Sequence, residues 1–476
     1  MELDKDLQAR QEARCLLQRA EQAQKTLAAM PQEKIDAIVK AMAEAFARCA
    51  EDLAGKACRE TGFGNPKDKK IKNLFASRTV WENIKDMKTV GVLKENPQDK
   101  LWEVGVPVGV IAAIVPSTNP TSTVCYKAMI ALKAGNTIVF SPHPKAIGCT
   151  LEAAKIVAQA AEAAGAPCGC IGCLSIPSMA GCQELMGAKE TRLILATGGP
   201  AMVRSAYSSG KPAIGVGAGN GPAYIHHSAD LHHALSCILR SKTFDYGTVC
   251  ASEQSIIVEK GMEQQVKLAA SSMGFYFMNT EEAARLAKLL FKPNGTLNPA
   301  IVGRPATALA EMAGFSVPND TEILVAREQE AGPTRPYSME KLCPVLAFFV
   351  MDSEDAVLQK AIEVLTHEGS GHTFAMHCED KAVVRKFALQ IPVSRFLVNT
   401  PAALGGIGAT TGLFPALTLG CGAVGGSSSS NNISPMDLLN IRRVAWDSKE
   451  APATPKVSDM DLVEIVTAKI LEKLNR

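Results

Sequence analysis

Cys250 lies in the sequence FDYGTVCASEQ (residues 244–254), between a glycine turn and a segment that predicts a β-strand. A thiol in such a turn can be exposed and oriented by the backbone, whereas a cysteine inside a helix or strand is usually an inert, small apolar residue. A cysteine that attacks a carbonyl group needs hydrogen-bond donors for the negative charge that develops on the oxygen. Among the 14 cysteines of the chain, Cys250 is therefore the candidate nucleophile.

Asn119 is the candidate partner for that chemistry. It lies in the turn PSTNP (residues 116–120), after an apolar run that predicts a strand. Its side-chain amide and the Cys250 backbone N–H would together supply two donors to a developing oxyanion. The alternative is a turn-forming asparagine before a proline, without any chemical role.

The elements that must position these residues follow from an alternation of apolar patterns after residue 101. VGVIAAIV, NTIVFSP and TRLILATGG predict strands, whereas YKAMIALKAG and TLEAAKIVAQAAEAAG predict helices. Strands that alternate with helices form a parallel, doubly wound α/β sheet, and ligands bind beyond the carboxyl ends of its strands. PSTNP and SPHP (residues 141–144) follow two of these predicted strands.

The composition excludes several classes of partner. The 476 residues carry a formal net charge of +2 at pH 7, with 21% charged and 47% hydrophobic residues, which is typical of a multi-domain globular protein and argues against nucleic acid or acidic lipid as a partner. The N-terminal residues lack the apolar core of a signal peptide, and the most apolar run (residues 104–115) is too short to span a membrane. We therefore expect a cytoplasmic protein with reduced thiols and no membrane partner.

The order of the motifs resembles the aldehyde dehydrogenase superfamily over about residues 10–446. The motifs that carry the resemblance are PSTNP, ATGGPAMV, KPAIGVGAGN, GTVC, EKLCPV and a late glycine-rich segment. FSPHP, GHT (residues 371–373) and GCGAVGGSSSSNNISPMDLLNIRRVA are similar to the CoA-acylating branch, in particular to the acetaldehyde dehydrogenase half of bifunctional alcohol/aldehyde dehydrogenases. No iron-dependent alcohol dehydrogenase half follows in this sequence, so the resemblance is to a stand-alone oxidoreductase.

The resemblance assigns roles to the residues that occupy these motifs. It implies that Cys250 is the nucleophile, that Asn119 is the oxyanion-hole amide and that Glu340 holds the nicotinamide ribose. The implied cofactor-binding residues are Ser141, Pro142 and His143 at the adenosine end, Thr197, Gly198 and Gly199 beside the phosphates, and Val203, Gly217 and Glu340. NAD is the expected cofactor, and NADP stays open because Pro144 lies where many NAD-preferring relatives have an acidic ribose ligand.

Val216 occupies the position at which hydrolytic members of the family carry a glutamate that activates water. Valine cannot accept a proton, whereas a free thiol is intrinsically nucleophilic and partly ionised near neutral pH. We therefore expect coenzyme A to remove the acyl group, with acetaldehyde or propionaldehyde as the substrate. His372 is a candidate to assist proton transfer. The alternative is a hydrogen-bonded loop histidine.

The resemblance also implies a domain organisation. We expect two domains, each with a doubly wound parallel sheet: an N-terminal Rossmann-like cofactor-binding domain at residues 1–223 and a catalytic domain at 224–396. The chain would then return to the cofactor domain at 397–446. A hairpin near residues 95–107 and a strand within 435–446 would join subunits into a homodimer or homotetramer.

Two histidine and cysteine clusters invite a metal interpretation. Cys168, Cys170 and Cys173 have the spacing C-x-C-x-x-C but lack an obvious fourth ligand, and the HHSADLHH stretch (residues 226–233) is more simply explained by Ser228 or Asp230 capping a helix. We therefore expect no metal site. Cys343 is expected to be a packing residue.

The last residues predict a separate amphipathic helix at 457–476, which follows a polar linker at 447–456. An isolated helix of this length is marginal in water, so its apolar stripe needs a partner. One possibility is its own subunit or oligomer. The other is a shell protein, since the arrangement resembles the encapsulation peptides of bacterial microcompartments.

Two alternative functions remain for the whole protein. One is a hydrolytic NAD(P)-dependent aldehyde dehydrogenase, and the other is a non-catalytic structural or metal-binding protein of a bacterial microcompartment.

Overall fold

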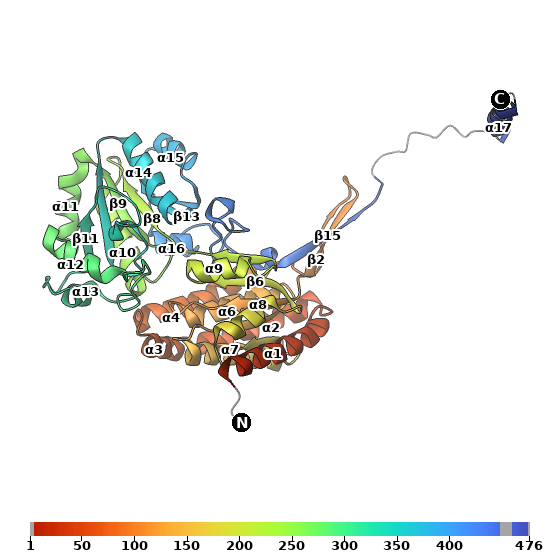
Figure 1. The fold of residues 1–476 in the computed structure, drawn as a ribbon, viewed down its shortest axis with the longest axis horizontal. Helices are drawn as coiled ribbons and strands as arrows, with labels where there is room; N and C mark the ends of the chain where they lie inside the picture. Colours follow the sequence, from red (N-terminus) through yellow and green to blue (C-terminus); the bar gives the residue numbers. More distant parts are fainter. Residues whose placement is uncertain (1–3, 448–458, 475–476) are drawn as a thin grey trace.

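The computed structural model describes residues 4–447 and 459–474, which contain three β-sheets surrounded by helices (Figure 1). The first sheet has five parallel strands in the order β5-β4-β3-β6-β7. These strands are β3 (Val110–Ile114), β4 (Thr137–Ser141), β5 (Ile171–Cys173), β6 (Thr191–Thr197) and β7 (Ala213–Val216). Every residue of the central strand β3 is buried, as expected for a parallel strand that is covered on both faces.

Helices cover both faces of the five-stranded sheet. Ile111 and Ala113 pack with residues of α2, α6 and α7, whereas Val110 and Ala112 pack with residues of α1 and α8. Because successive side chains of a strand point to opposite faces, these two clusters define a doubly wound sheet. The helices of this part are α1 (Lys5–Leu27), α2 (Gln32–Arg48), α3 (Ala50–Thr61), α4 (Pro66–Leu74), α5 (Val80–Ile84), α6 (Pro120–Lys133), α7 (Ile147–Ala163), α8 (Met179–Gly187) and α9 (Pro200–Tyr207).

The second sheet has seven parallel strands in the order β10-β11-β12-β9-β8-β13-β14. It also separates two apolar clusters, with Tyr224 and Ile257 on one face and Ala223 and Ile256 on the other. Its strands are β8 (Gly221–Ile225), β9 (Glu253–Glu259), β10 (Phe275–Phe277), β11 (Ile323–Arg327), β12 (Val345–Met351), β13 (Gly371–His377) and β14 (Val393–Val398). Its helices are α10 (Leu231–Thr243), α11 (Glu263–Ser271), α12 (Thr280–Leu290), α13 (Ala306–Met312), α14 (Glu354–His367) and α15 (Lys381–Ala388). The predicted α/β fold with two parallel sheets is confirmed.

A third, antiparallel sheet projects from the body of the molecule (Figure 1). It consists of β1 (Gly91–Asn96), β2 (Leu101–Pro107) and β15 (Leu439–Ala445), with β2 in the middle. The hairpin begins at Gly91, earlier than the predicted residue 95, because Gly91 and Val92 already pair with Gly105 and Val104. The small β-element is therefore present, and its role in joining subunits stays a proposal.

The segment after β14 returns to the first sheet. It contains α16 (Ala402–Gly406), and Ile433 and Leu438 join the apolar cluster that covers the five-stranded sheet. The side chain of Asn136 donates to the backbone carbonyl of Leu438 at 2.8 Å. The second sheet begins with Gly221, slightly before the domain boundary expected after residue 223.

Short helical turns and one terminal helix complete the described structure. The turns are η1 (Phe75–Thr79), η2 (Phe244–Gly247), η3 (Lys260–Met262), η4 (Pro336–Ser338), η5 (Ala423–Gly425) and η6 (Pro435–Leu438). The terminal helix is α17 (Asp459–Leu474), whereas most of the predicted linker lies outside the described residues. None of the helices within residues 4–447 and 459–474 has the length and apolar character that a membrane span requires.

Candidate active site

Cys250 lies in the loop between η2 and β9. The backbone conformation of this loop is tightly constrained. Asp245 and Tyr246 in η2 both have left-handed backbone angles, with φ of 50° and 51°, and Gly247 follows with φ of 77°. A Cβ at position 247 would lie 3.0 Å from the carbonyl carbon of Cys343, so this approach requires glycine. The Ser252 N–H then donates to the carbonyl of Val249 at 3.0 Å and closes the turn around Cys250.

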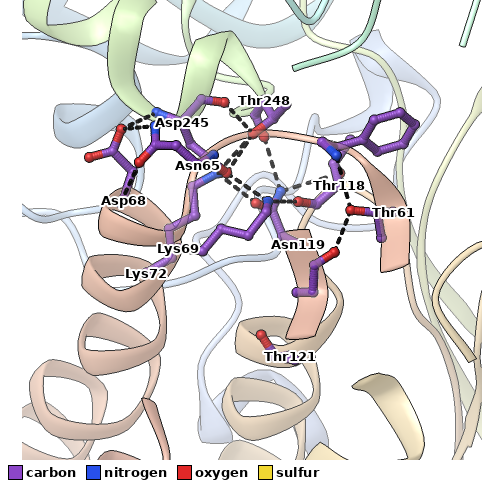
Figure 2. Close-up of polar contacts among 12 residues, drawn as sticks. Thr61, Asn65, Asp68, Lys69, Lys72, Thr118, Asn119, Thr121, Asp245 and Thr248 are labelled. Carbon is purple, nitrogen blue, oxygen red and sulfur yellow. Dashed lines mark hydrogen bonds and ion pairs between the residues drawn. The ribbon is translucent and has the colours of Figure 1, made fainter. Parts of the chain in front are cut away.

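Asn119 ends the segment after β3 and is the N-cap residue of α6, but its side chain does not cap that helix. Its amide nitrogen Nδ2 donates to the Thr248 carbonyl at 3.0 Å, and its Oδ1 accepts from Lys72 Nζ at 2.6 Å. Figure 2 shows the amide between α4 and the turn that carries Thr248. Asn119 precedes a proline, as expected of a turn-forming asparagine. Its side chain, however, also contacts the loop that carries Cys250.

A cavity of about 250 Å³ joins these two residues to much of the predicted cofactor site. The predicted site residues that line it are Asn119, His143, Thr197, Gly198, Gly199, Gly217, Cys250 and Glu340, together with Val216. Ser141, Pro142, Val203 and His372 are not among its lining residues, and Ser141 and Pro142 are buried. A larger hollow of about 730 Å³ lies beside β1 and β2 and is lined in part by Val90, Pro107 and Arg442.

The aldehyde dehydrogenase family model matches residues 6–273. The chain belongs to the aldehyde dehydrogenase family. The bifunctional aldehyde-alcohol dehydrogenase AdhE of Escherichia coli (strain K12) is 45% identical over 440 residues, which cover 91% of this chain and 49% of AdhE. The chain thus spans about half the length of this relative.

Two solved structures show the same fold. An acetylating aldehyde dehydrogenase from Geobacillus thermoglucosidasius has a TM-score of 0.93 and 49% sequence identity, with 95% of this chain and 100% of that chain covered. A propionaldehyde dehydrogenase from the Clostridium phytofermentans fucose utilisation bacterial microcompartment has a TM-score of 0.83 and 26% identity, with 93% and 98% covered.

The surroundings of the candidate nucleophile favour its protonated form. Burial raises the pKa of the Cys250 thiol to about 12, with further contributions from the negative charges of Glu340 and Cys421, while Arg395 opposes the shift. Burial and the neighbouring Glu368 raise the pKa of Glu340 to about 8. Glu340 Oε1 accepts the Gly219 N–H at 2.9 Å, which orients the carboxyl group at the edge of the cavity. The charge of Glu340 thus raises the proton affinity of the Cys250 thiol.

His372 lies in β13 and is fully buried, which corrects its alternative interpretation as a loop histidine. The backbone reason is that residues 371–377 pair with β14 and β8 inside the sheet. Its Nδ1 shares a hydrogen bond with Thr373 Oγ1 at 2.8 Å, and burial, assisted by Arg395, lowers its pKa well below 6.5. A neutral imidazole therefore lies behind the Cys250 loop, and its proton-transfer role stays a prediction.

The other clusters considered from the sequence are explained by local structure. Asp230 caps α10 by accepting the His233 N–H at 3.0 Å, so the predicted capping role of Asp230 is confirmed. His226, His227 and Glu259 place one ligand atom each within 4.8 Å of one another. His226 Nδ1 bonds Ser228 Oγ at 2.8 Å, whereas its Nε2 is buried without a hydrogen-bond partner among the described residues. Cys343 is fully buried in an apolar cluster, as predicted. The expectation of no metal site stays a prediction.

Sequence reasoning missed a buried ionic network that contacts Asn119. Lys69 and Lys72 on α4 both reach the Oδ2 atom of Asp245, at 2.9 and 2.5 Å. Lys72 also lines the cavity. The only local signal is that the two lysines are three residues apart and so share one face of a helix.

Proposed function

We propose that the protein is an NAD(P)-dependent, CoA-acylating aldehyde dehydrogenase that converts short aldehydes such as acetaldehyde or propionaldehyde to acyl-CoA. The observation that carries the proposal is that Val216 lines the same cavity as Cys250 and Asn119. Among the described residues that line this cavity, Glu340 is the only one with a carboxyl group, and the resemblance assigns it to the cofactor ribose. The similar structure from Geobacillus thermoglucosidasius is that of an acetylating aldehyde dehydrogenase, which supports the same chemistry.

The side chains of this site would act in a fixed order. Cys250 loses its thiol proton to solvent and its sulfur adds to the aldehyde carbon, while an N–H of Asn119 and the backbone of the Cys250 loop donate to the oxygen. The bound nicotinamide supplies the acceptor for the hydride that leaves that carbon. Cys250 then holds the acyl group as a thioester. The thiolate of coenzyme A attacks this thioester, takes the acyl group and leaves the Cys250 sulfur to regain a proton.

The residues present fit a dinucleotide cofactor. Thr197 Oγ1 is buried without a hydrogen-bond partner in the part of the chain that the structure describes, and it lies where the resemblance places the phosphates. Gly198 and Gly199 follow it and line the cavity, and a Cβ at position 199 would meet no atom within 4 Å. Thr197 would therefore donate to the cofactor, and the two glycines would leave space for the approach of a phosphate.

The proposal is tested by following reduced-cofactor formation from C2 to C4 aldehydes with and without coenzyme A, using NAD and NADP in parallel. We expect reduction to depend on coenzyme A and the product to be acyl-CoA, because water lacks a positioned base. Cys250→Ala provides the background rate. Equal rates without coenzyme A, or carboxylate as the main product at saturating coenzyme A, would show that the enzyme is hydrolytic.

We further propose that α17 attaches the enzyme to the shell of a bacterial microcompartment. Its apolar residues are exposed, from 48% for Val466 to 81% for Met460, so they do not pack against residues 4–447. The exposed stripe consists of Met460, Leu462, Val463, Ile465, Val466, Ile470, Leu471 and Leu474. The similar propionaldehyde dehydrogenase from Clostridium phytofermentans comes from such a compartment, which supports this location.

The antiparallel β1-β2-β15 sheet is the proposed oligomerisation element. Trp102 on β2 and Trp446 just after β15 contact each other edge to face at 4.9 Å between ring centroids, and both are partly exposed. The large hollow that includes Val90, Pro107 and Arg442 lies at the base of the same sheet. An exposed aromatic pair beside a hollow favours contact with a second copy of the chain.

A further inference from the structure

Lys72 and the Thr248 carbonyl hold the Asn119 side chain from opposite sides. Lys72 Nζ donates to Asn119 Oδ1 at 2.6 Å, and Asn119 Nδ2 donates to the Thr248 carbonyl at 3.0 Å. Figure 2 shows both contacts, with Lys72 reaching up from α4. A lysine ammonium group has only donors, so it can face only the oxygen of an amide. This pair of contacts therefore excludes the flipped orientation of the Asn119 amide.

The fixed orientation leaves one N–H of Asn119 for the cavity. Its other contact is with Thr118 Oγ1 at 3.3 Å, a longer hydrogen bond to a residue that also lines the cavity. A substrate oxyanion that accepted this N–H would replace a weak contact with a charge-assisted one. The positive charge of Lys72 on the opposite end of the amide would also polarise the N–H toward the oxyanion.

Asp245 keeps the buried Lys72 charged and in place. The Asp245 carboxylate is fully buried and accepts from Lys72, Lys69 and Thr248 Oγ1 on Oδ2, and from the Asn65 N–H on Oδ1. Burial lowers the pKa of Lys72 to about 8, and the charge of Asp245 is the main influence that opposes this shift. The same lysines hold the pKa of Asp245 below its usual value against the effect of burial.

The backbone segments around Asp245 approach its carboxylate closely. A Cβ at Gly64 would lie 1.9 Å from Asp245 Oδ1, so the loop before α4 approaches the carboxylate at a distance that only glycine allows. The Asp245 N–H donates to Asp68 Oδ2 at 2.7 Å. The turn that carries Thr248 and Cys250 is thereby fastened to α4, the helix that carries Lys72.

We propose that Lys72 is a positioning residue that fixes the Asn119 amide as the oxyanion donor, with Asp245 as its counter-charge. This inference rests on the proposed function, because it concerns the step in which the Cys250 sulfur adds to a carbonyl group. Lys72 acts through Asn119 and takes no proton from the substrate.

Lys69 provides a matched control on the same helix. It binds the same Asp245 oxygen at 2.9 Å, but its other hydrogen bond goes to the Thr118 backbone carbonyl at 2.8 Å and not to the Asn119 side chain. Lys69 and Lys72 are also equally buried, each with 3% exposed surface. Lys69→Met therefore reproduces the loss of a buried lysine next to Asp245, while the contact between Lys72 and Asn119 remains.

The test compares Lys72→Met with Lys69→Met in the full-length enzyme. Four quantities are measured: kcat and KM for CoA-dependent aldehyde oxidation, the Kd of the cofactor, the rate of Cys250 alkylation by iodoacetamide, and Tm. We expect Lys72→Met to lower kcat at least about tenfold, because a misplaced amide loses part of the 10²–10³-fold effect of one oxyanion donor. Alkylation forms no oxyanion, so its rate should follow that of Lys69→Met.

A double-mutant cycle separates positioning from general destabilisation. In an Asn119→Ala background, Lys72→Met should change kcat by less than about twofold, because the amide that Lys72 positions is absent. A further large loss in that background, or equal losses of kcat in Lys72→Met and Lys69→Met, would overturn the inference. If Lys72→Met does not fold, Lys72→Gln serves instead, since it keeps a neutral donor of similar length. It should retain a higher kcat than Asn119→Ala, and an equal or lower value would also overturn the inference.

The wild-type enzyme distinguishes failure of this inference from failure of the proposed function. A wild type without CoA-dependent aldehyde oxidation would contradict the function itself. A wild type with that activity, together with an unaffected Lys72→Met variant, would contradict only the positioning role.

Discussion

Gly219 lies against the backbone of Cys250, so that a Cβ at position 219 would be 1.9 Å from the Cys250 carbonyl oxygen and 3.2 Å from His372 Cε1. Real Cβ atoms do not approach a backbone oxygen so closely, so the Cys250 loop would have to move. We therefore expect Gly219→Ala to lower kcat by at least about tenfold, since small misplacements of a reacting group have large effects on rate. Gly187→Ala is the control, because a Cβ there meets no atom within 4 Å. Unchanged steady-state kinetics in Gly219→Ala would contradict the assigned position of the nucleophile.

The pKa of Cys250 gives a second prediction. With a pKa of about 12, the thiol should be alkylated by iodoacetamide at a rate that keeps rising from pH 7 to 10, since only the thiolate reacts. Glu340 ionises near pH 8 and its charge raises the pKa of the thiol, so Glu340→Gln should accelerate alkylation at pH 9 but not at pH 6.5, where Glu340 is already neutral. A rate that reaches a plateau below pH 9 in the wild type would contradict this picture.

Val216 provides the third prediction, which concerns the choice between water and coenzyme A. Val216→Glu would place a proton acceptor in the cavity with Cys250, and we expect the rate of carboxylate formation without coenzyme A to rise by about tenfold, a modest share of the effect of a well-placed general base. Val216→Gln is the matched control, because it has nearly the same shape and cannot accept the proton. The two rates are measured by product analysis, and equal rates would mean that water is excluded for another reason.

The sequence was sufficient to predict the architecture because its strands are buried on both faces. The strand β3, VIAAI, is an uninterrupted apolar run, and such runs between alanine-rich helices indicate a parallel sheet. Cys250 and Asn119 could be proposed because each lies in a turn within a motif that resembles those of the family, and both line one cavity in the structure. The start of the hairpin at Gly91 was missed because β1 is largely exposed and has no apolar pattern.

The ionic network could not be predicted, for a different physical reason. Lys72 and Asp245 are 173 residues apart, and their contact depends on the packing of α4 against the loop of Cys250. The sequence of α4, PKDKKIKNL, has the charge of a solvent-exposed helix, whereas Lys69 and Lys72 are buried in the structure. The alternative that placed His372 in a loop was wrong, because His372 belongs to the buried strand β13 although glycines lie beside it in the sequence.

Subunit association is the subject of the fourth prediction. Changing both Trp102 and Trp446 to Ala removes the exposed aromatic pair at the outer end of the antiparallel sheet, and we expect a lower molecular mass in light scattering coupled to size-exclusion chromatography. Met179→Ala, which removes an exposed apolar side chain on α8, is the control and should keep the wild-type mass. A double variant with the wild-type mass would show that another surface joins the subunits.

The fifth prediction separates attachment from catalysis. The apolar side chains of α17 are exposed and belong to no part of the cavity around Cys250, so deletion of residues 447–476 should leave kcat and KM unchanged within about twofold, as expected for a distant, independent segment. The same deletion should abolish co-purification with microcompartment shell proteins, because the apolar stripe is the proposed contact. Replacing Ile465 and Ile470 by Glu within the full chain should have the same effect without shortening it, whereas Lys469→Ala should retain binding. Full shell binding by both the deletion and the Ile465 and Ile470 variant would contradict the attachment role of α17.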